Sequence, residues 1–199
     1  MYRTAASPLL DVVEQTLQIA NGRPIEATHE RRQVTRTFLF VDIVGSTRLL
    51  DAIGDAAWVQ LLSWHEQALG SLFARHDGEL VNQAGDGFFV SFVEPRAAIE
   101  CAVAIQRVLA RHREAHGFAL ELRIGLHRAD VFRCGPAYRG KGVHVVARIA
   151  ALASGGEILA SRETIEASHA DIAASRSRAV ELAGISEPIH VQRISWSSS

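Results

Sequence analysis

Several features that mark other protein classes are scarce or absent in this sequence. Only two cysteines, Cys101 and Cys134, occur in 199 residues, so no disulfide framework is expected. The formal net charge of −1 gives no general attraction to nucleic acid or to an anionic membrane. No apolar run approaches the roughly 18–20 residues that span a bilayer, and Asp11 and Glu14 interrupt the apolar start of the chain. We therefore expect a cytoplasmic protein whose partners include neither nucleic acid nor membrane.

The composition is that of an ordinary globular domain, with 48% hydrophobic and 22% charged residues. The length fits one domain with a short extension. Apolar residues at near-helical spacing predict a short amphipathic helix within residues 9–19, followed by a polar arm. We therefore divide the chain into an N-terminal helix and arm (1–35), one main domain (36–195) and a disordered tail (196–199).

Apolar periodicity and turn residues predict the elements of the main domain. Strands are expected at 37–43, 79–84, 88–92 and 120–126, with 129–133 as the hairpin partner of the last. Helices are expected from residue 47, at 55–76, 95–113, 140–153 and 162–167, and further short strands at 157–160, 177–182 and 189–194. This order predicts an α+β fold of ferredoxin-like type, in which helices cover one face of a mostly antiparallel sheet.

Two acidic residues fall at strand ends that can be neighbours. Asp42 closes an apolar run, and Asp86 lies in the tight turn of a predicted hairpin. Converging carboxylates suit a pair of divalent cations, which can activate an attacking oxygen and neutralise a phosphate chain. Gly45, Ser46 and Thr47 then open a helix whose free backbone N–H groups suit phosphate oxygens. Taken alone, the same residues also fit a turn aspartate at 86 and a helix cap at 42.

Five segments in sequence order resemble the motifs of the class III adenylate/guanylate cyclase catalytic domain. The resemblance covers residues 36–195, and each motif by itself is weak. The segments are FVDIVGST (40–47), GDGF (85–88), RIGLH (123–127), GVHVVARI (142–149) and LAGISEPI (182–189).

The resemblance implies the class III cyclase fold and an active site shared across a homodimer. One subunit would hold two divalent cations, Mg²⁺ or Mn²⁺, through Asp42, Asp86 and the backbone carbonyl of Ile43. Its partner would supply His144, to orient the ribose, and Arg148, to stabilise the pentacoordinate phosphate. His144 and Arg148 are four residues apart, so both project from one helix face.

The substrate-reading positions depart from the family pattern. Asn82 stands where the family carries a base-reading lysine, and Ala137 stands where the aspartate of ATP-specific enzymes lies. His144 replaces the asparagine of the interface helix, and Ala183 replaces a phosphate-contacting lysine. Each lost charge-assisted hydrogen bond costs roughly 1.5–3 kcal/mol, so base selection is expected to be weak or directed to another nucleotide.

The sequence thus predicts a metal-dependent cyclase that converts a nucleoside triphosphate, ATP in the first instance, to the 3′,5′-cyclic nucleotide and pyrophosphate. One alternative is a cyclase acting on a guanine or pyrimidine nucleotide. A second is a catalytically silent cyclase-like module that binds nucleotide or a partner. A third, a metal-dependent nucleotidyl polymerase, shares the carboxylate chemistry but leaves Arg148 and its helix unexplained.

Overall fold

The computed structural model describes residues 31–197. The predicted helix within residues 9–19, the arm up to residue 30 and residues 198–199 of the predicted tail lie outside the described residues. Trp196, where that tail was expected to begin, is half-buried, and its indole N–H donates to the backbone carbonyl of Gly156 at 2.7 Å.

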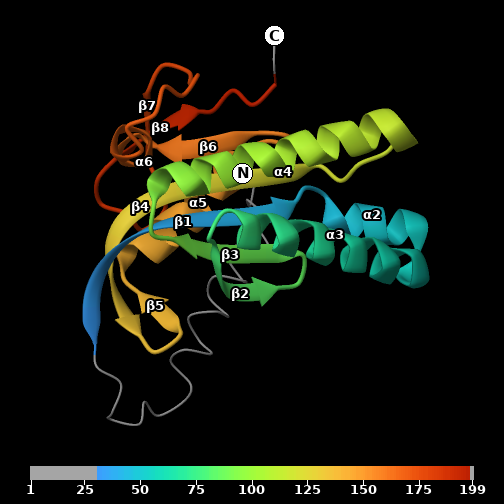
Figure 1. The fold of residues 1–199 in the computed structure, drawn as a ribbon, viewed down its shortest axis with the longest axis horizontal. Coiled ribbons are helices and arrows are strands. Elements are labelled where there is room, and N and C mark those ends of the chain that lie inside the picture. Colours follow the sequence, from blue (N-terminus) through green and yellow to red (C-terminus); the bar gives the residue numbers. More distant parts are fainter. Residues whose placement is uncertain (1–30, 198–199) are drawn as a thin grey trace, which may run out of the picture.

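Strands and helices are interspersed along the described chain, and most lie where the apolar periodicity predicts them (Figure 1). Among residues 31–197, no helix is both long and apolar enough to cross a membrane. The elements are β1 (Arg32–Ile43), α2 (Ser46–Ile53), α3 (Asp55–Arg75), β2 (Glu79–Ala84), β3 (Gly87–Phe92), α4 (Pro95–His116), β4 (Leu122–Cys134), β5 (Ala137–Arg139), α5 (Lys141–Leu152), β6 (Ile158–Ser161), α6 (Arg162–Ala167), β7 (Arg178–Val180) and β8 (Ile189–Arg193).

The strands form one mostly antiparallel sheet, as predicted. Its order is β2-β3-β1-β4-β6-β8-β7, with β5 paired to β4 outside this path. Only β4 and β6 run parallel among the described pairs. The central pair is the longest, since β1 and β4 match residue for residue from Arg32 opposite Arg133 to Ile43 opposite Leu122.

The hairpin predicted between residues 120–126 and 129–133 is wrong. Both segments belong to the single strand β4, because β1 pairs with it without interruption. The true partner is β5, which follows a turn at Gly135 and Pro136 and places Ala137 opposite Cys134. The expected strand at 37–43 is also longer than predicted, beginning at Arg32.

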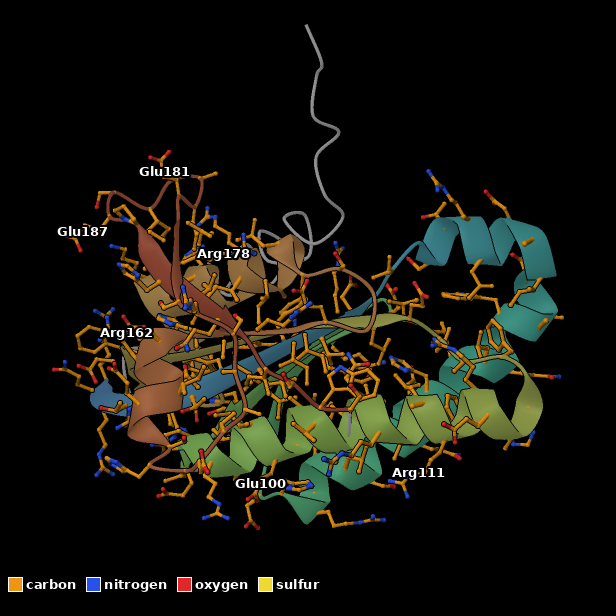
Figure 2. The ribbon with its side chains drawn as sticks, turned by 90° about the horizontal axis from the view of Figure 1, so that it is seen from above. Glu100, Arg111, Arg162, Arg178, Glu181 and Glu187 are labelled. Atoms are coloured by element: carbon orange, nitrogen blue, oxygen red, sulfur yellow. The ribbon has the colours of Figure 1, made fainter. Side chains whose placement is uncertain are left out.

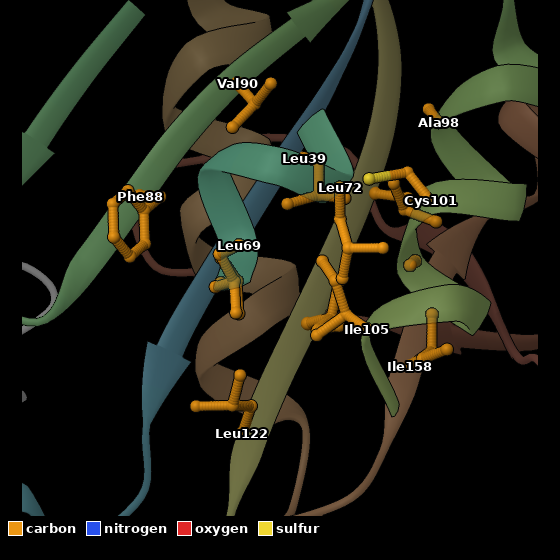
Figure 3. Close-up of a cluster of buried hydrophobic side chains, with 14 of the residues drawn as sticks. Leu39, Leu69, Leu72, Phe88, Val90, Ala98, Cys101, Ile105, Leu122 and Ile158 are labelled. Carbon is orange, nitrogen blue, oxygen red and sulfur yellow. The ribbon is translucent and has the colours of Figure 1, made fainter. Parts of the chain in front are cut away.

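Helices α3 and α4 cover one face of the sheet. Side chains alternate between faces along a strand, so Leu39 and Val41 of β1 point together into a core with both helices. Figure 3 shows Leu39 close to Leu72 of α3 and Ile105 of α4.

Helix α5 covers the opposite face, so the expectation of helices on one face only is wrong. Phe38 and Phe40 point to that side, where Phe38 stacks on Phe89 with ring centroids 5.1 Å apart. Val146 and Ala150 of α5 complete this second core. Figure 1 shows α4 in front of the strands and α5 behind them.

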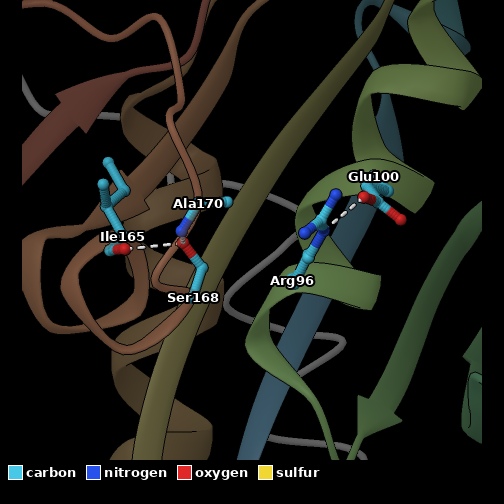
Figure 4. Close-up of polar contacts among 5 residues, drawn as sticks. All are labelled: Arg96, Glu100, Ile165, Ser168 and Ala170. Carbon is cyan, nitrogen blue, oxygen red and sulfur yellow. Dashed lines mark hydrogen bonds and ion pairs between the residues drawn. The ribbon is translucent and has the colours of Figure 1, made fainter.

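Charged side chains lie on the outside of these layers. Figure 2 shows Glu100 and Arg111 on the outer side of α4, and Glu181 and Glu187 near the connection between β7 and β8. Figure 4 shows the ion pair that Arg96 makes with Glu100 at 2.7 Å, and the Ser168 hydroxyl that donates to the Ile165 carbonyl after α6. Exposed pairs such as Arg96–Glu100 contribute little to stability.

Gly125 of β4 lets α5 approach the sheet closely. A Cβ there would lie 2.5 Å from the backbone nitrogen of Ala150 and 2.7 Å from the carbonyl oxygen of Val146. Both atoms belong to the helix backbone, so they cannot move aside as the end of a side chain can. A residue larger than glycine would therefore push α5 away from β4.

We predict that Gly125→Ala lowers the free energy of unfolding by about 1–3 kcal/mol or more, because an overpacked core must shift backbone. Denaturant unfolding followed by circular dichroism measures it. Gly70→Ala is the matched control, since Gly70 is exposed within α3 with nothing within 4 Å of its Cβ position. That change should be neutral or stabilising by about 0.5–1 kcal/mol. Equal effects of the two changes would contradict close packing at Gly125.

Candidate active site

Asp42 is held near the end of β1 by a charged neighbour on β4. Register places it directly opposite Arg123, whose Nε and Nη2 donate to the Asp42 Oδ2 atom at 3.0 and 2.7 Å. Both side chains are largely buried, with 13% exposure for Asp42 and 18% for Arg123. By alternation from Phe40, Asp42 lies on the sheet face that α5 covers, just beyond the helix-covered aromatic core.

Asp86 lies at the same end of the sheet. The turn between β2 and β3 consists of Gly85 and Asp86, and Gly85 has a φ of 60°, as a type II′ hairpin requires. Val41 pairs with Phe88 in an antiparallel arrangement, so Asp42, just after Val41, and Asp86, just before β3, lie at the same end of these strands. The Oδ2 atom of Asp86 is buried without a hydrogen-bond partner among the described residues.

The two carboxylates interact electrostatically. Burial raises the pKa of the Asp42 carboxyl to about 6, and the negative charge of Asp86 adds to the rise, while the hydrogen bonds and charge of Arg123 oppose it. Burial raises the pKa of Asp42 more than Arg123 lowers it, because the position is poorly hydrated and one guanidinium faces the charge of two carboxylates. A divalent cation would relieve this repulsion, which gives a physical reason for a cation to bind here.

The start of α2 lies immediately after Asp42. Gly45 precedes the helix with a left-handed φ of 70°, and no side chain in the described part of the chain caps the first turn. Ser46 and Thr47 begin this eight-residue helix, and the carbonyl of Gly45 accepts from Leu49. The N–H groups of the first turn therefore remain available to an anion beside the carboxylates.

His144 and Arg148 lie one turn apart on α5, and both are half-buried. Burial lowers the pKa of His144, and the charge of Arg148 lowers it further. The Nε atom of Arg148 is buried with no hydrogen-bond partner in the described part of the chain. Its Nη2 atom lies 3.5 Å from the Cβ position of Gly184, so the loop after β7 approaches the guanidinium closely.

Asn82 and Ala137 belong to different strands near the sheet edge that β2 forms. A bulge between Leu80 and Asn82 shifts the register of β2, and Asn82 pairs with Phe89. Paired residues share a face, so Asn82 lies on the side that α5 covers. Ala137 begins β5. The next residue, Tyr138, donates a hydrogen bond from its hydroxyl to the Glu79 carboxylate of β2 at 2.9 Å. The hydrogen bond ties the β5 hairpin to β2.

The predicted site residues therefore fall into three groups in the structure. Asp42, Ile43 and Asp86 meet at one end of the sheet, with residues 45–47 beside them. His144 and Arg148 project from α5, and residues 82 and 137 lie on β2 and β5.

Sequence reasoning missed two residues near the carboxylates. Arg123 was noticed only as part of a motif, and its contact with Asp42 depends on the β1–β4 pairing, which was not predicted. His65 of α3 is fully buried, and neither ring nitrogen has a complete hydrogen bond to any of residues 31–197. A histidine within the apolar face of a predicted helix was the one available signal for it.

Comparisons with known proteins identify a family that this chain resembles over most of its length. The family described as the adenylate and guanylate cyclase catalytic domain matches residues 28–192. A protein of Rhizobium meliloti (strain 1021) whose name contains the words adenylate cyclase is 31% identical over 164 residues, covering 80% of this chain and 28% of that protein. The serine/threonine-protein kinase pkn2 of Myxococcus xanthus is 28% identical over 160 residues, covering 79% of this chain and 19% of the kinase. The chain thus spans less than a third of the length of these curated relatives.

Solved structures share the fold. The adenylyl cyclase CyaB from P. aeruginosa superposes with a TM-score of 0.76 at 23% identity, covering 85% of this chain and 97% of that one. The guanylyl cyclase Cya2 superposes with a TM-score of 0.74 at 22% identity, covering 82% and 93%. Because both adenylyl and guanylyl cyclases match, the fold does not distinguish between the two purines.

The raised pKa of Asp42 predicts a pH-dependent stability in the absence of divalent cations. The folded state holds this proton more tightly than the unfolded chain, so the resulting stabilisation is complete below pH 3.8 and is lost as the pH rises through about 6. Relative to Asp42→Asn, which does not titrate there, the wild type should lose stability across this interval. Urea unfolding in EDTA at successive pH values measures it, and a pH-independent difference between the two proteins would contradict the raised pKa.

Proposed function

The chain belongs to the adenylate and guanylate cyclase catalytic domain family, and from that membership we propose that it cyclises a nucleoside triphosphate, with ATP as the first candidate. The 3′-hydroxyl would attack the α-phosphorus, forming the new P–O bond as the bond to pyrophosphate breaks. The proton of the hydroxyl leaves to solvent. The observation that carries the proposal is the meeting of Asp42 with Asp86, whose buried oxygen has no partner among the described residues.

Class III cyclases generally use divalent metal ions, and the residues of this chain fit such ions. Two carboxylates and the Ile43 carbonyl offer the hard oxygen ligands that Mg²⁺ or Mn²⁺ prefers. Within residues 31–197, no three His, Cys, Asp or Glu side chains gather as a metal site, so substrate oxygens and water would complete the coordination. When bound, two such cations would polarise the attacking hydroxyl and neutralise the triphosphate.

The beginning of α2 is proposed to bind the phosphates. The N–H groups after Gly45, together with Ser46 and Thr47, face no capping side chain, and the helix dipole favours an anion there. Arg123 keeps the carboxylate end of the sheet partly neutral before a cation arrives, because it balances one of two negative charges.

The remaining groups are proposed to come from a second copy of the chain, since the family is typically dimeric. The unpartnered Nε of Arg148 is suited to stabilise charge that develops on the α-phosphate in the transition state. His144, one turn earlier and with a lowered pKa, would be neutral near pH 7 and could hydrogen-bond a ribose hydroxyl. Each active site would then combine one subunit's carboxylates with its partner's α5.

Base selection is proposed to depend on residues 82 and 137. Asn82 can both donate and accept a hydrogen bond, whereas Ala137 can do neither and leaves room for the base. The same two positions favour the second candidate function, a silent module that binds nucleotide without turning it over, because neither provides the charged base contact found in family members. Asp42 and Asp86 favour the active enzyme, since a silent site needs no converging carboxylates.

The proposal is tested by incubating the purified protein with ATP, GTP, CTP and UTP separately in the presence of Mn²⁺. We expect one cyclic nucleotide to dominate, with pyrophosphate released in equal amount, as read by mass spectrometry. Absence of product from all four nucleotides, with a folded protein, would support the silent module.

Mixing two inactive variants provides the control for a shared site. Asp42→Asn and Arg148→Ala should each abolish turnover alone. After subunit exchange at equal amounts, half of the dimers contain one complete site, so activity should recover to about a quarter of the wild-type value. No recovery, although mixed dimers form, would place the carboxylates and the arginine in separate sites.

Charged residues at the two base-reading positions should change nucleotide preference. We predict that Asn82→Lys together with Ala137→Asp raises kcat/KM for ATP relative to GTP by about tenfold or more, since a charge-assisted hydrogen bond contributes roughly 1.5–3 kcal/mol. Initial rates with both nucleotides measure the ratio. Asn82→Met with Ala137→Asn is a control of similar size without the charges, and an equal change in both double variants would reject base reading by these positions.

A further inference from the structure

A fully buried histidine lies beneath the hairpin turn that carries Asp86. His65 of α3 has 0% exposure, and neither ring nitrogen has a hydrogen-bond partner among the described residues. Its ring packs against Phe88, with centroids 5.3 Å apart and planes 53° apart. The other buried residues of α3 are Leu69, Leu72 and Phe73, so His65 is the one polar member of the helix's buried face.

Packing alone does not account for an imidazole at this position. Neutral histidine carries one N–H donor and one acceptor nitrogen, and leaving such groups buried without a partner costs about 1–3 kcal/mol. A leucine or phenylalanine would fill the space without that cost. A polar ring at such a site therefore calls for a polar partner nearby.

The groups around the ring identify that partner. The backbone and carboxylate of Asp86 both lie close enough to raise the pKa of His65, as does Glu66, although burial outweighs all three and lowers it overall. An imidazole ring carries at least one N–H in either protonation state, so His65 has a donor to offer. The Asp86 backbone acts on the ring as a hydrogen-bond acceptor does, although no fully formed hydrogen bond to it is present among the described residues.

Helix α3 also holds the hairpin at the neighbouring position. The side-chain amide of Gln83 donates to Glu66 at 2.6 Å, and Gln83 pairs with Phe88 across the hairpin. The helix thus reaches β2 just before the turn and, through His65, the turn itself. Two successive helix residues are placed to fix the orientation of Asp86.

We propose that His65 is a positioning residue for the cation site, donating its ring N–H to the backbone carbonyl of Asp86 when the cation is bound. This contact would hold the turn in place while the Asp86 carboxylate, whose Oδ2 has no protein partner in the described chain, stays directed towards the cation and Asp42. The inference rests on the proposed function, since it assumes that Asp42 and Asp86 bind divalent cations.

The test compares Mn²⁺ affinity among variants in the absence of nucleotide, using the electron paramagnetic resonance signal of free Mn²⁺. His65→Phe keeps a ring against Phe88 but removes the N–H, and should weaken Mn²⁺ binding by about 10-fold or more, the usual effect of losing a residue that orients a metal ligand. His65→Asn and His65→Gln place an amide N–H near one or the other ring nitrogen, and at least one should recover most of the affinity. His65→Leu replaces His65→Phe if the latter does not fold.

A matched control distinguishes a positioning role of His65 from a merely structural one. His127 is also a buried histidine, but it bonds to Ser161 at 2.9 Å, away from the hairpin turn. His127→Leu should lower the thermal unfolding midpoint without changing Mn²⁺ affinity. Wild-type affinity in folded His65→Phe, or equal weakening in all His65 variants, would overturn the positioning role.

Mn²⁺ binding by the wild type and by Asp86→Asn distinguishes a failure of the positioning role from a failure of the proposed function. If the wild type binds Mn²⁺ and Asp86→Asn does not, the cation site stands whether or not a cyclic nucleotide forms, and the His65 comparison remains decisive. If the wild type binds no Mn²⁺ beyond that held by the nucleotide itself, either alone or with a 3′-deoxynucleoside triphosphate that cannot be cyclised, both the cation site and the role of His65 are overturned.

Discussion

The pairing of β1 with β4 is the constraint on which the other features of this domain depend. Twelve consecutive residue pairs join the two strands, and the period of two along each strand then fixes which side chains share a face. The register sets Arg123 against Asp42 and brings Gly125 under α5, while the opposite side chains fill the core beneath α3 and α4. A slip of one residue would exchange the two faces and separate the charges.

The carboxylate end of the sheet carries an electrostatic imbalance that folding alone does not remove. The buried Asp42 carboxylate is paired with Arg123 but is also repelled by the charge of Asp86, and one Asp86 oxygen has no partner among the described residues. Such an arrangement lowers the stability of the empty protein, since buried charges need full compensation. Proteins that bind a charged ligand commonly have a lower folding stability because of such a cluster at the binding site.

Much of this architecture could be predicted from local sequence signals. Helix α3 was expected at 55–76 and is found at Asp55–Arg75, because an apolar face at helical spacing ends at a glycine turn. The β2–β3 hairpin followed from Gly85-Asp86-Gly87. The mostly antiparallel α+β class was also correct, since the order of elements leaves few other layer arrangements.

What could not be predicted depends on contacts between distant segments. The alternation within residues 129–133 fits a separate strand as well as the continuation of β4, and only the long β1 shows which is formed. The position of α5 on the far face depends on the space above Gly125, and the roles of Arg123 and His65 depend on neighbours about 80 and 20 residues away in the sequence. The roles assigned to Asp42, Asp86, His144 and Arg148 remain predictions.

The unbroken course of β4 also constrains how this domain can change during evolution. The strand runs 13 residues, or about 43 Å at 3.3 Å per residue, from the partner of Ile43 to the turn that leads to Ala137. A single inserted or deleted residue inside it would rotate every following side chain to the opposite face. Changes in length should therefore accumulate at the turn around Gly135 and Pro136, which lies outside the β1 pairing. The β4–β5 hairpin, which carries Ala137, can then vary in length while the carboxylate end keeps one geometry.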